Sequence, residues 1–178
     1  MMKINFKKLN IKNTEQLKSL VKWDNDLEFR HLIRRTEDKN EVIKPITFNK
    51  LKTRYEDNPK RAEGIYIIYD NNRPIGNFSL QIDPEHLLRK IKGTSWLGFT
   101  IGEKEYWGSG AAKIAMEFFE QESISLGLTR VELGAFECNP RAEKFYKKMG
   151  YKEIGRFADF TYWDGRYWSD IRMEKYLK

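Results

Sequence analysis

The chain has 178 residues, of which 40% are hydrophobic, 14% aromatic and 33% charged. This is the composition of a globular protein, and it excludes a disordered or collagen-like chain. The length predicts one domain over residues 1–178, large enough to bury a sizeable core. The formal net charge of +7 favours a polyanionic ligand, but it suits a nucleotide cofactor, a nucleic acid or plain solubility equally well.

The cysteine content and the apolar segments of the sequence indicate where the protein is located, and its histidines indicate whether it binds a metal. Cys138 is the one cysteine, which excludes an internal disulfide. Residues 1–8 lack the apolar core of a secretory signal, and no apolar run approaches the ~20 residues of a membrane-spanning helix. We therefore expect a cytoplasmic protein with no membrane partner. His31 and His86 are isolated in the sequence, so no metal site is predicted.

The first third of the chain predicts one strand and three helical segments. Alternating apolar and polar residues indicate a strand over residues 2–9. Asn13 and Thr47 each suit the N-cap of a following helix, and a further helical stretch is predicted near residues 27–33. The apolar residues of these three segments are Leu17, Leu20 and Val21, then Leu27, Leu32 and Ile33, and finally Phe48, Leu51 and Tyr55.

Strands dominate after Gly64. Residues 65–69 and 75–83 flank the turn sequence 71–74 and predict an antiparallel hairpin. Another strand is expected over 94–102, followed by an amphipathic helix between Gly110 and Gly127. The strand at 131–135 follows that helix, so it should pair in parallel with 94–102. Two last strands, near 151–162 and 166–177, flank the turn dipeptide Asp164-Gly165, which completes a mixed α/β sheet.

A glycine loop between the strand at 94–102 and the next helix carries the first chemical signal. The sequence Tyr106-Trp107-Gly108-Ser109-Gly110-Ala111 opens a helix, where several backbone N–H groups are unpaired at the positive end of the helix dipole. Such a loop can hold phosphate. The Gly-Lys-Ser/Thr sequence of a P-loop is missing, which argues against a nucleoside triphosphatase.

The second signal is a short helix that follows the strand at 131–135. Asn139 suits its N-cap and Pro140 its first position, and Gly150 ends it. Tyr146 lies on the apolar face of this helix, together with Ala142, Phe145 and Met149. From the spacing alone, Tyr146 can be a core aromatic residue or a functional one.

Together, Gly108-x-Gly110 and Asn139-x-Arg141-Ala142-(x)3-Tyr146-(x)3-Gly150 resemble the GCN5-related N-acetyltransferase (GNAT) superfamily, on the branch of ribosomal-protein alanine N-acetyltransferases. The resemblance covers nearly the whole chain and is strongest over residues 94–155. It implies the GNAT fold: a mixed α/β (α+β), mostly antiparallel sheet of six to seven strands, with a central splayed parallel pair and flanking helices.

The resemblance also implies acetyl-CoA as co-substrate, wedged between residues 95–101 and 131–137. Its pantetheine would bond the backbone of Phe99, Thr100 and Ile101. Its diphosphate would lie on the amides of Tyr106, Trp107, Gly108, Ser109, Gly110 and Ala111. Asn139 is a helix cap, a cofactor contact or both. For Lys144, a solvated side chain is the favoured interpretation, and a contact with the 3′-phosphate of the cofactor is the alternative.

The implied reaction moves an acetyl group to a primary amine, with Tyr146 assisting the departing thiolate. Many relatives carry a glutamate base where this chain has Trp96, so Glu137 becomes the alternative base, with Asp83 or a chain of waters as others. A second departure is Glu105, which replaces the usual Gln or Arg and weakens the attraction for diphosphate slightly.

The acceptor is left open among a protein or peptide N-terminus, a small amine such as a polyamine, and an amine-bearing antibiotic. Trp96 motivates a rival function, a non-catalytic acyl-CoA-binding or partner-docking module. No nucleic-acid partner is expected, because no helix-turn-helix or stacking motif is present. Relatives often pair, and the aromatic C-terminal strands offer a surface for a homodimer.

Overall fold

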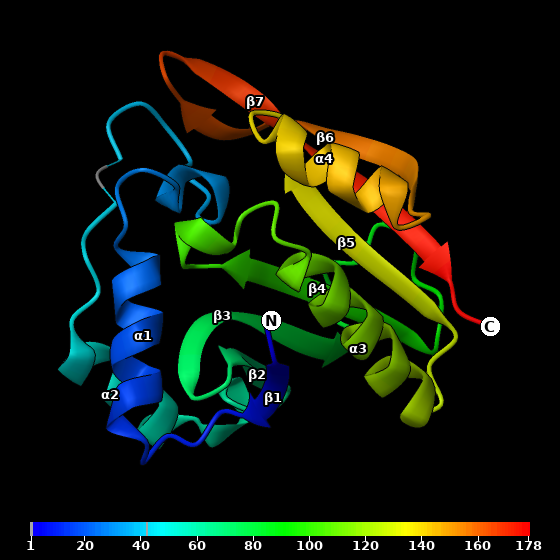
Figure 1. Ribbon diagram of the computed structural model, residues 1–178. Helices are drawn as coiled ribbons and strands as arrows, with labels where there is room; N and C mark the ends of the chain where they lie inside the picture. Colours follow the sequence, from blue (N-terminus) through cyan, green and yellow to red (C-terminus); the bar gives the residue numbers. More distant parts are fainter. Residues whose placement is uncertain (1, 42) are drawn as a thin grey trace. The chain divides into compact units, whose positions relative to one another are not determined.

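The structure is a computed structural model and describes residues 2–41 and 43–178. The described residues form seven strands, four α-helices and three 3-10 turns (Figure 1). In chain order these are β1 (Ile4–Lys8), α1 (Thr14–Asp24), a 3-10 turn (Arg30–Leu32), α2 (Phe48–Asp57), a 3-10 turn (Pro59–Arg61), β2 (Ile65–Asp70), β3 (Arg73–Ile82), β4 (Thr94–Ile101), a 3-10 turn (Lys104–Tyr106), α3 (Ala111–Ser125), β5 (Arg130–Phe136), α4 (Pro140–Lys148), β6 (Lys152–Trp163) and β7 (Arg166–Tyr176).

The strands hydrogen-bond in the order β1-β2-β3-β4-β5-β7-β6. Strands β4 and β5 are joined through α3 and pair in parallel, from Thr94 opposite Arg130 to Leu97 opposite Leu133. The pairs β1–β2, β2–β3, β5–β7 and β6–β7 are antiparallel. This confirms the mixed sheet with one parallel pair that the sequence predicts.

The chain divides into two compact units, each built from three separate segments. The first unit comprises residues 2–26, 45–80 and 99–119. The second unit comprises residues 27–44, 81–98 and 120–178. Strand β4 and helix α3 each contribute to both units.

In the first unit, α1 and α2 contact each other, and both begin at the predicted caps. The Asn13 side chain accepts a hydrogen bond from the Gln16 N–H, and the Thr47 side chain accepts one from the Lys50 N–H. Each cap satisfies one of the N–H groups that a helix start leaves unpaired. The buried residues Leu17, Ile46, Leu51 and Tyr55 form a core between these helices.

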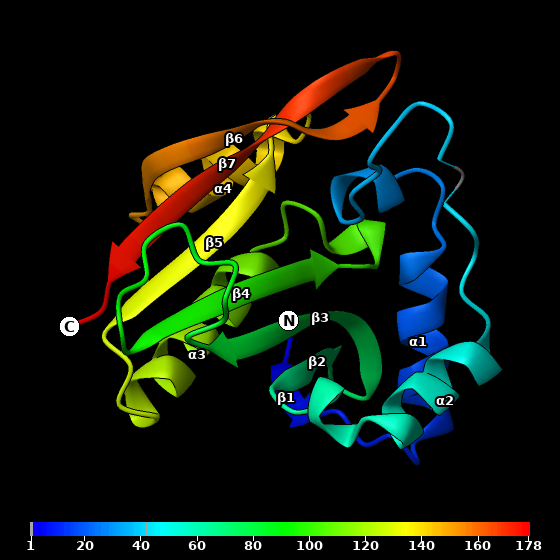
Figure 2. The same ribbon diagram turned by 180° about the vertical axis from the view of Figure 1, so that it is seen from behind.

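In the second unit, β6 and β7 form a hairpin that turns at Asp164 and Gly165, with φ angles of 49° and 82°. Helix α4 lies on one face of the β5, β7 and β6 strands, as Figure 1 shows. The connection between β3 and β4, residues 83–93, lies across the opposite face of β5 and β7 (Figure 2). This connection therefore covers a face of the sheet that helices leave open.

One predicted helix is wrong. Residues 27–33 contain only the 3-10 turn Arg30–Leu32. Leu27 is 69% exposed, so it does not contribute to an apolar helical face, and no side chain caps the turn. A spacing of apolar residues without a cap or a common buried face is not enough to sustain a helix. No described helix has the length and apolar character needed to cross a membrane.

Candidate functional site

The glycine loop of the first unit has the open backbone that the sequence predicts. Gly108 and Gly110 have φ angles of 81° and 96°, and a Cβ added to either would meet no atom within 4 Å. Helix α3 begins directly afterwards, at Ala111. The N–H groups of Gly108 and Gly110 donate no hydrogen bond to any described residue. Two uncovered donors at a helix start suit an anion such as a diphosphate.

Side chains hold the loop in this conformation. The Ser109 hydroxyl donates to the Tyr106 carbonyl, at 2.7 Å. The Tyr106 hydroxyl donates to Asp70 at 3.0 Å, and the Trp107 indole N–H donates to the Ile101 carbonyl at 2.8 Å. These bonds anchor the loop to the ends of β2 and β4. Within the loop, the N–H groups of Tyr106, Trp107, Ser109 and Ala111 donate to other protein groups, whereas those of Gly108 and Gly110 donate to none that the structure describes.

The negative charge of Glu105 is neutralised by a neighbour. A guanidinium nitrogen of Arg73 lies 2.5 Å from Glu105 Oε1 and 3.0 Å from Glu103 Oε2. A hydrogen bond from its own backbone N–H and the Arg73 guanidinium both lower the pKa of Glu105. The loop therefore does not present an unpaired carboxylate to an incoming anion, although it lacks the usual Gln or Arg.

Phe99, Thr100 and Ile101 are the last residues of β4 and also belong to the first unit. One side of this segment is occupied by β3. A Cβ added to Gly76 of that strand would lie 2.3 Å from the Thr100 carbonyl oxygen. The glycine at position 76 thus lets the two backbones approach closely.

The second unit contains Tyr146, whose environment is unusual for a core tyrosine. Its side chain is buried, with 6% of the residue exposed, and packs beside the rings of Phe145 and Tyr151. Its hydroxyl nevertheless forms no hydrogen bond with any described residue. Burial raises the pKa of the Tyr146 hydroxyl, so it keeps its proton at neutral pH. The ring is buried, but the hydroxyl oxygen is not among the sealed polar atoms without a partner, so it is available to a ligand.

The remaining predicted residues of the second unit have mixed environments. The Asn139 side chain caps α4 by accepting a hydrogen bond from the Ala142 N–H at 3.1 Å, which confirms its structural role. Lys144 is exposed on α4. Glu137 Oε1 lies 3.0 Å from Arg156, and its Oε2 accepts a bond from the Ser169 N–H. Asp83 accepts bonds from the N–H groups of Gly93 and Thr94, so both its oxygens serve a turn.

A buried charged face on β5 and β7 was not predicted from the sequence. Arg130 and Glu132 are fully buried and lie 2.5 Å apart, and Glu174 is 2.8 Å from Arg130. Asp170 and Arg172 extend the same face and are 2.6 Å apart. The sequence signal is a set of opposite charges spaced two residues apart on both strands, a pattern usually found on solvent-facing sides.

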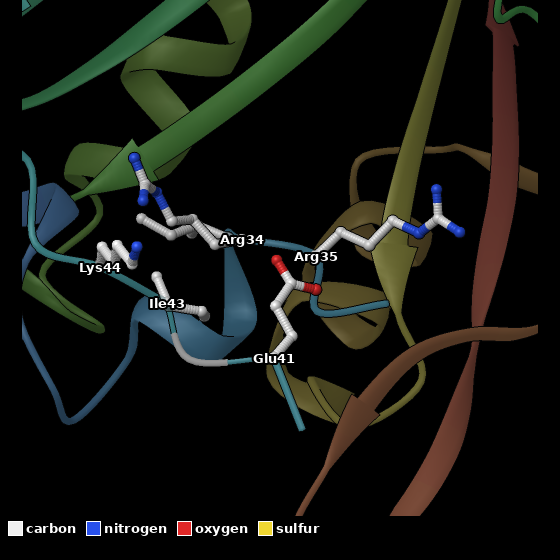
Figure 3. Close-up of a pocket in the computed structure, with 6 residues that line it drawn as sticks. Arg34, Arg35, Glu41, Ile43 and Lys44 are labelled. Carbon is white, nitrogen blue, oxygen red and sulfur yellow. The ribbon is translucent and has the colours of Figure 1, made fainter. Parts of the chain in front are cut away.

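A hollow of about 550 Å³ lies in the 33–44 segment of the second unit (Figure 3). Arg34 and Lys44 extend to one side of it, and Arg35 reaches away from them on the other. None of the residues predicted as functional lines this hollow; its lining residues are Ile33, Arg34, Arg35, Glu41, Ile43 and Lys44. Within residues 2–41 and 43–178, no three His, Cys, Asp or Glu residues cluster closely enough to hold a metal ion.

Comparisons with known proteins were made on sequence and on structure. A family model described as the acetyltransferase (GNAT) family matches residues 22–151. No curated protein sequence matches the chain. The N-acetyltransferase from Staphylococcus aureus Mu50 has a similar structure, with a TM-score of 0.77, 16% identity and 99% coverage of both chains.

Two further solved structures are similar. The spermidine N-acetyltransferase from Vibrio cholerae, in complex with CoA and spermine, gives a TM-score of 0.76 at 18% identity and covers 98% of this chain and 95% of its own. The ribosomal-protein-alanine N-acetyltransferase from Brucella melitensis gives 0.75 at 14% identity, with 97% and 99% covered. At these identities the likeness shows the fold.

Proposed function

Because the chain belongs to the acetyltransferase (GNAT) family, we propose that it is an N-acetyltransferase that moves the acetyl group of acetyl-CoA to a primary amine. The observation that carries this proposal is the Tyr146 hydroxyl, which is protonated, lies on a buried side chain and has no partner among the described residues. The hydroxyl oxygen is not among the sealed polar atoms that lack a partner, so a ligand can reach it.

Cofactor binding rests on main-chain donors. We assign the diphosphate of acetyl-CoA to the amides of residues 106–111, since those of Gly108 and Gly110 are uncovered. The pantetheine is assigned to the backbone of Phe99, Thr100 and Ile101. The first turn of α4, capped by Asn139, and the exposed Lys144 are assigned as further contacts. When bound, acetyl-CoA supplies the activated acetyl group.

Tyr146 is assigned to the leaving sulfur. A thiolate leaves more easily when a donor hydrogen-bonds or protonates it. A tyrosine (pKa ~10) is a weaker acid than a thiol (pKa ~8.5), and burial raises the Tyr146 pKa further. Tyr146 therefore acts by hydrogen bonding or by late proton transfer, and the proton it gives must be replaced from the amine.

The acceptor amine poses a second proton problem. A lysine-like ammonium with a pKa of ~10.4 must lose a proton before it attacks, which costs roughly 4.6 kcal/mol at pH 7. A carboxylate near the amine can accept this proton as a general base. Glu137 is the carboxylate that the sequence offers, and its pairing with Arg156 occupies one of its oxygens.

Two acceptor types follow from the relatives of similar structure, a polyamine and a protein N-terminus that begins with alanine. A thiol-release assay with acetyl-CoA tests both, together with kanamycin as an amine-bearing antibiotic. We expect release with at least one of these amines. Calorimetric binding of acetyl-CoA without release for any amine contradicts the proposal and favours the rival acyl-CoA-binding module, which the replacement of a glutamate by Trp96 motivates.

The variant Tyr146→Phe tests the assigned role. It removes a hydroxyl that holds no described partner, so the fold should be unaffected, while turnover should fall roughly 100- to 10,000-fold. Affinity for acetyl-CoA should change little. The matched control is Tyr176→Phe, because Tyr176 is 56% exposed at the end of β7. Equal turnover in the two variants removes Tyr146 from the mechanism.

A further inference from the structure

The charged face of β5 and β7 contains a carboxylate that the mechanism above does not use. Asp170 lies on β7 opposite Phe136 of β5, and only 3% of the residue is exposed. Its Oδ2 accepts a hydrogen bond from Arg172 Nε at 2.6 Å. Its Oδ1 accepts no hydrogen bond from any described residue, yet it is not sealed off, since 5% of the side chain is accessible.

The free oxygen lies over a glycine. A Cβ added to Gly134 would be 2.6 Å from Asp170 Oδ1, closer than Cβ atoms approach other heavy atoms in proteins. Gly134 follows Leu133, the last residue of β5 that pairs with β4. The glycine therefore keeps room for Oδ1 at the point of β5 where the parallel ladder ends.

Arg172 fixes the carboxylate in place. Its guanidinium carbon lies 4.6 Å from the ring centroid of Trp96 and 4.8 Å from that of Phe157. It also donates to the His86 carbonyl at 2.9 Å. A guanidinium that contacts two aromatic rings and donates to both a carboxylate and a carbonyl has little freedom. Trp96, which stands where many relatives have a glutamate, thus supports a guanidinium that orients Asp170.

The charges facing Asp170 come from three elements. Arg172 is on β7, Glu132 is on β5, and Arg35 approaches from the 27–44 segment, where its Nε donates to the Phe160 carbonyl. Burial raises the pKa of Asp170, and the two arginines oppose that rise without cancelling it. A raised pKa makes a carboxylate a better proton acceptor near neutral pH.

We propose that Asp170, oriented by Arg172, is the general base that deprotonates the acceptor amine. The inference rests on the proposed acetyl transfer. The ammonium gives one proton to Asp170 Oδ1, and its nitrogen bonds to the acetyl carbon while the carbon–sulfur bond breaks. The sulfur takes the Tyr146 proton. The second amine proton restores Tyr146, and Asp170 returns its proton to solvent, so that amide, thiol and one proton are formed.

Glu137 is the competing base, and the two carboxylates differ in their surroundings. Glu137 has 39% of its side chain exposed, and both its oxygens have partners in Arg156 and Ser169. Asp170 is buried and keeps one oxygen free. A base needs a free lone pair and a dry setting, which favours Asp170.

The test compares Asp170→Asn with Glu137→Gln, using whichever of spermidine and an alanine-starting peptide the wild type acetylates. The asparagine oxygen still accepts from Arg172, so the fold and acetyl-CoA affinity should be retained. We expect kcat/KM to fall roughly 100- to 10,000-fold in Asp170→Asn, and the acid limb of its pH profile to disappear. In Asp170→Ala, added formate should restore part of the rate.

The control variant is Asp164→Asn, the same substitution at an exposed turn residue of the same hairpin. Asp164 has a positive φ, which asparagine also tolerates. If Asp170→Asn keeps the wild-type acid limb, or if formate gives no rescue, the assignment of Asp170 is wrong. A loss of the acid limb in Glu137→Gln alone assigns the base to Glu137. If the wild-type protein acetylates none of these amines, both the proposed function and the assignment of Asp170 are wrong.

Discussion

The Arg130 cluster of the second unit allows a quantitative prediction. Arg130 has no exposed surface, and its guanidinium bonds Glu132 at 2.5 Å, Glu174 at 2.8 Å and the Thr94 hydroxyl at 3.1 Å. The variant Arg130→Met keeps a side chain of similar length and removes the charge. It leaves Glu132, which has 0% side-chain exposure, with the N–H groups of Leu88 and Arg89 and with the more distant Arg172, at 3.5 Å, as its nearest cation.

The magnitude follows from the uncompensated charge. Removing one partner of a buried ion pair costs about 3–5 kcal/mol, mostly because the other charge stays buried. For a chain of this size, each kcal/mol lowers Tm by roughly 2–4 °C, which gives a fall of about 6–20 °C. Thermal melting and urea unfolding of wild type and variant measure this difference in the free energy of unfolding.

A double variant tests the cause. Arg130→Met with Glu132→Gln removes both charges, and the glutamine oxygen can still accept from the Leu88 N–H, which bonds Glu132 at 2.6 Å. We expect it to be more stable than Arg130→Met alone. The reasoning is refuted if Arg130→Met costs under about 1 kcal/mol, or if the two substitutions simply add.

Two further predictions concern individual residues. Burial alone would raise the pKa of Glu103, but hydrogen bonds from Lys22, Trp23 and Arg73 lower it below its ordinary value. The stability that this lowered pKa provides is fully present above the pKa of Glu103 in the unfolded chain, and it is lost as pH falls through the pKa in the folded protein. Glu103→Gln should therefore flatten the acid side of a plot of stability against pH. An unchanged plot contradicts this. Gly134→Ala should displace Asp170 and cost about 1–3 kcal/mol with a loss of turnover, and an unperturbed crystal structure of the variant would count against the close contact.

Local signals in the sequence were sufficient for much of the fold. Asn13 and Thr47 cap the helices that they predict, and Asp164-Gly165 turns the last hairpin, because caps and tight turns depend on a few neighbouring residues. The helix expected at 27–33 was wrong for the same reason, since no cap or shared buried face supports it there.

The buried charged face could not be predicted, because it depends on long-range pairing. Asp170 comes beside Gly134 only through the register of β5 and β7, which the sequence does not reveal. Alternating charges on a strand normally indicate water on that side. Here Arg130 and Glu132 are buried, since residues 83–93 cross the face and supply backbone partners.

The segment between β3 and β4 therefore does more than connect the two strands. Its backbone N–H groups at Leu88 and Arg89 satisfy Glu132, and its carbonyls at His86 and Arg89 bond Arg172 and Arg130. Insertions and deletions, normally tolerated in surface loops, should be rare here. Among homologues, a change in the length of this segment should covary with the loss of charge at positions 130, 132 and 172. For the same reason, an inserted tag or grafted loop in this segment should destabilise the protein.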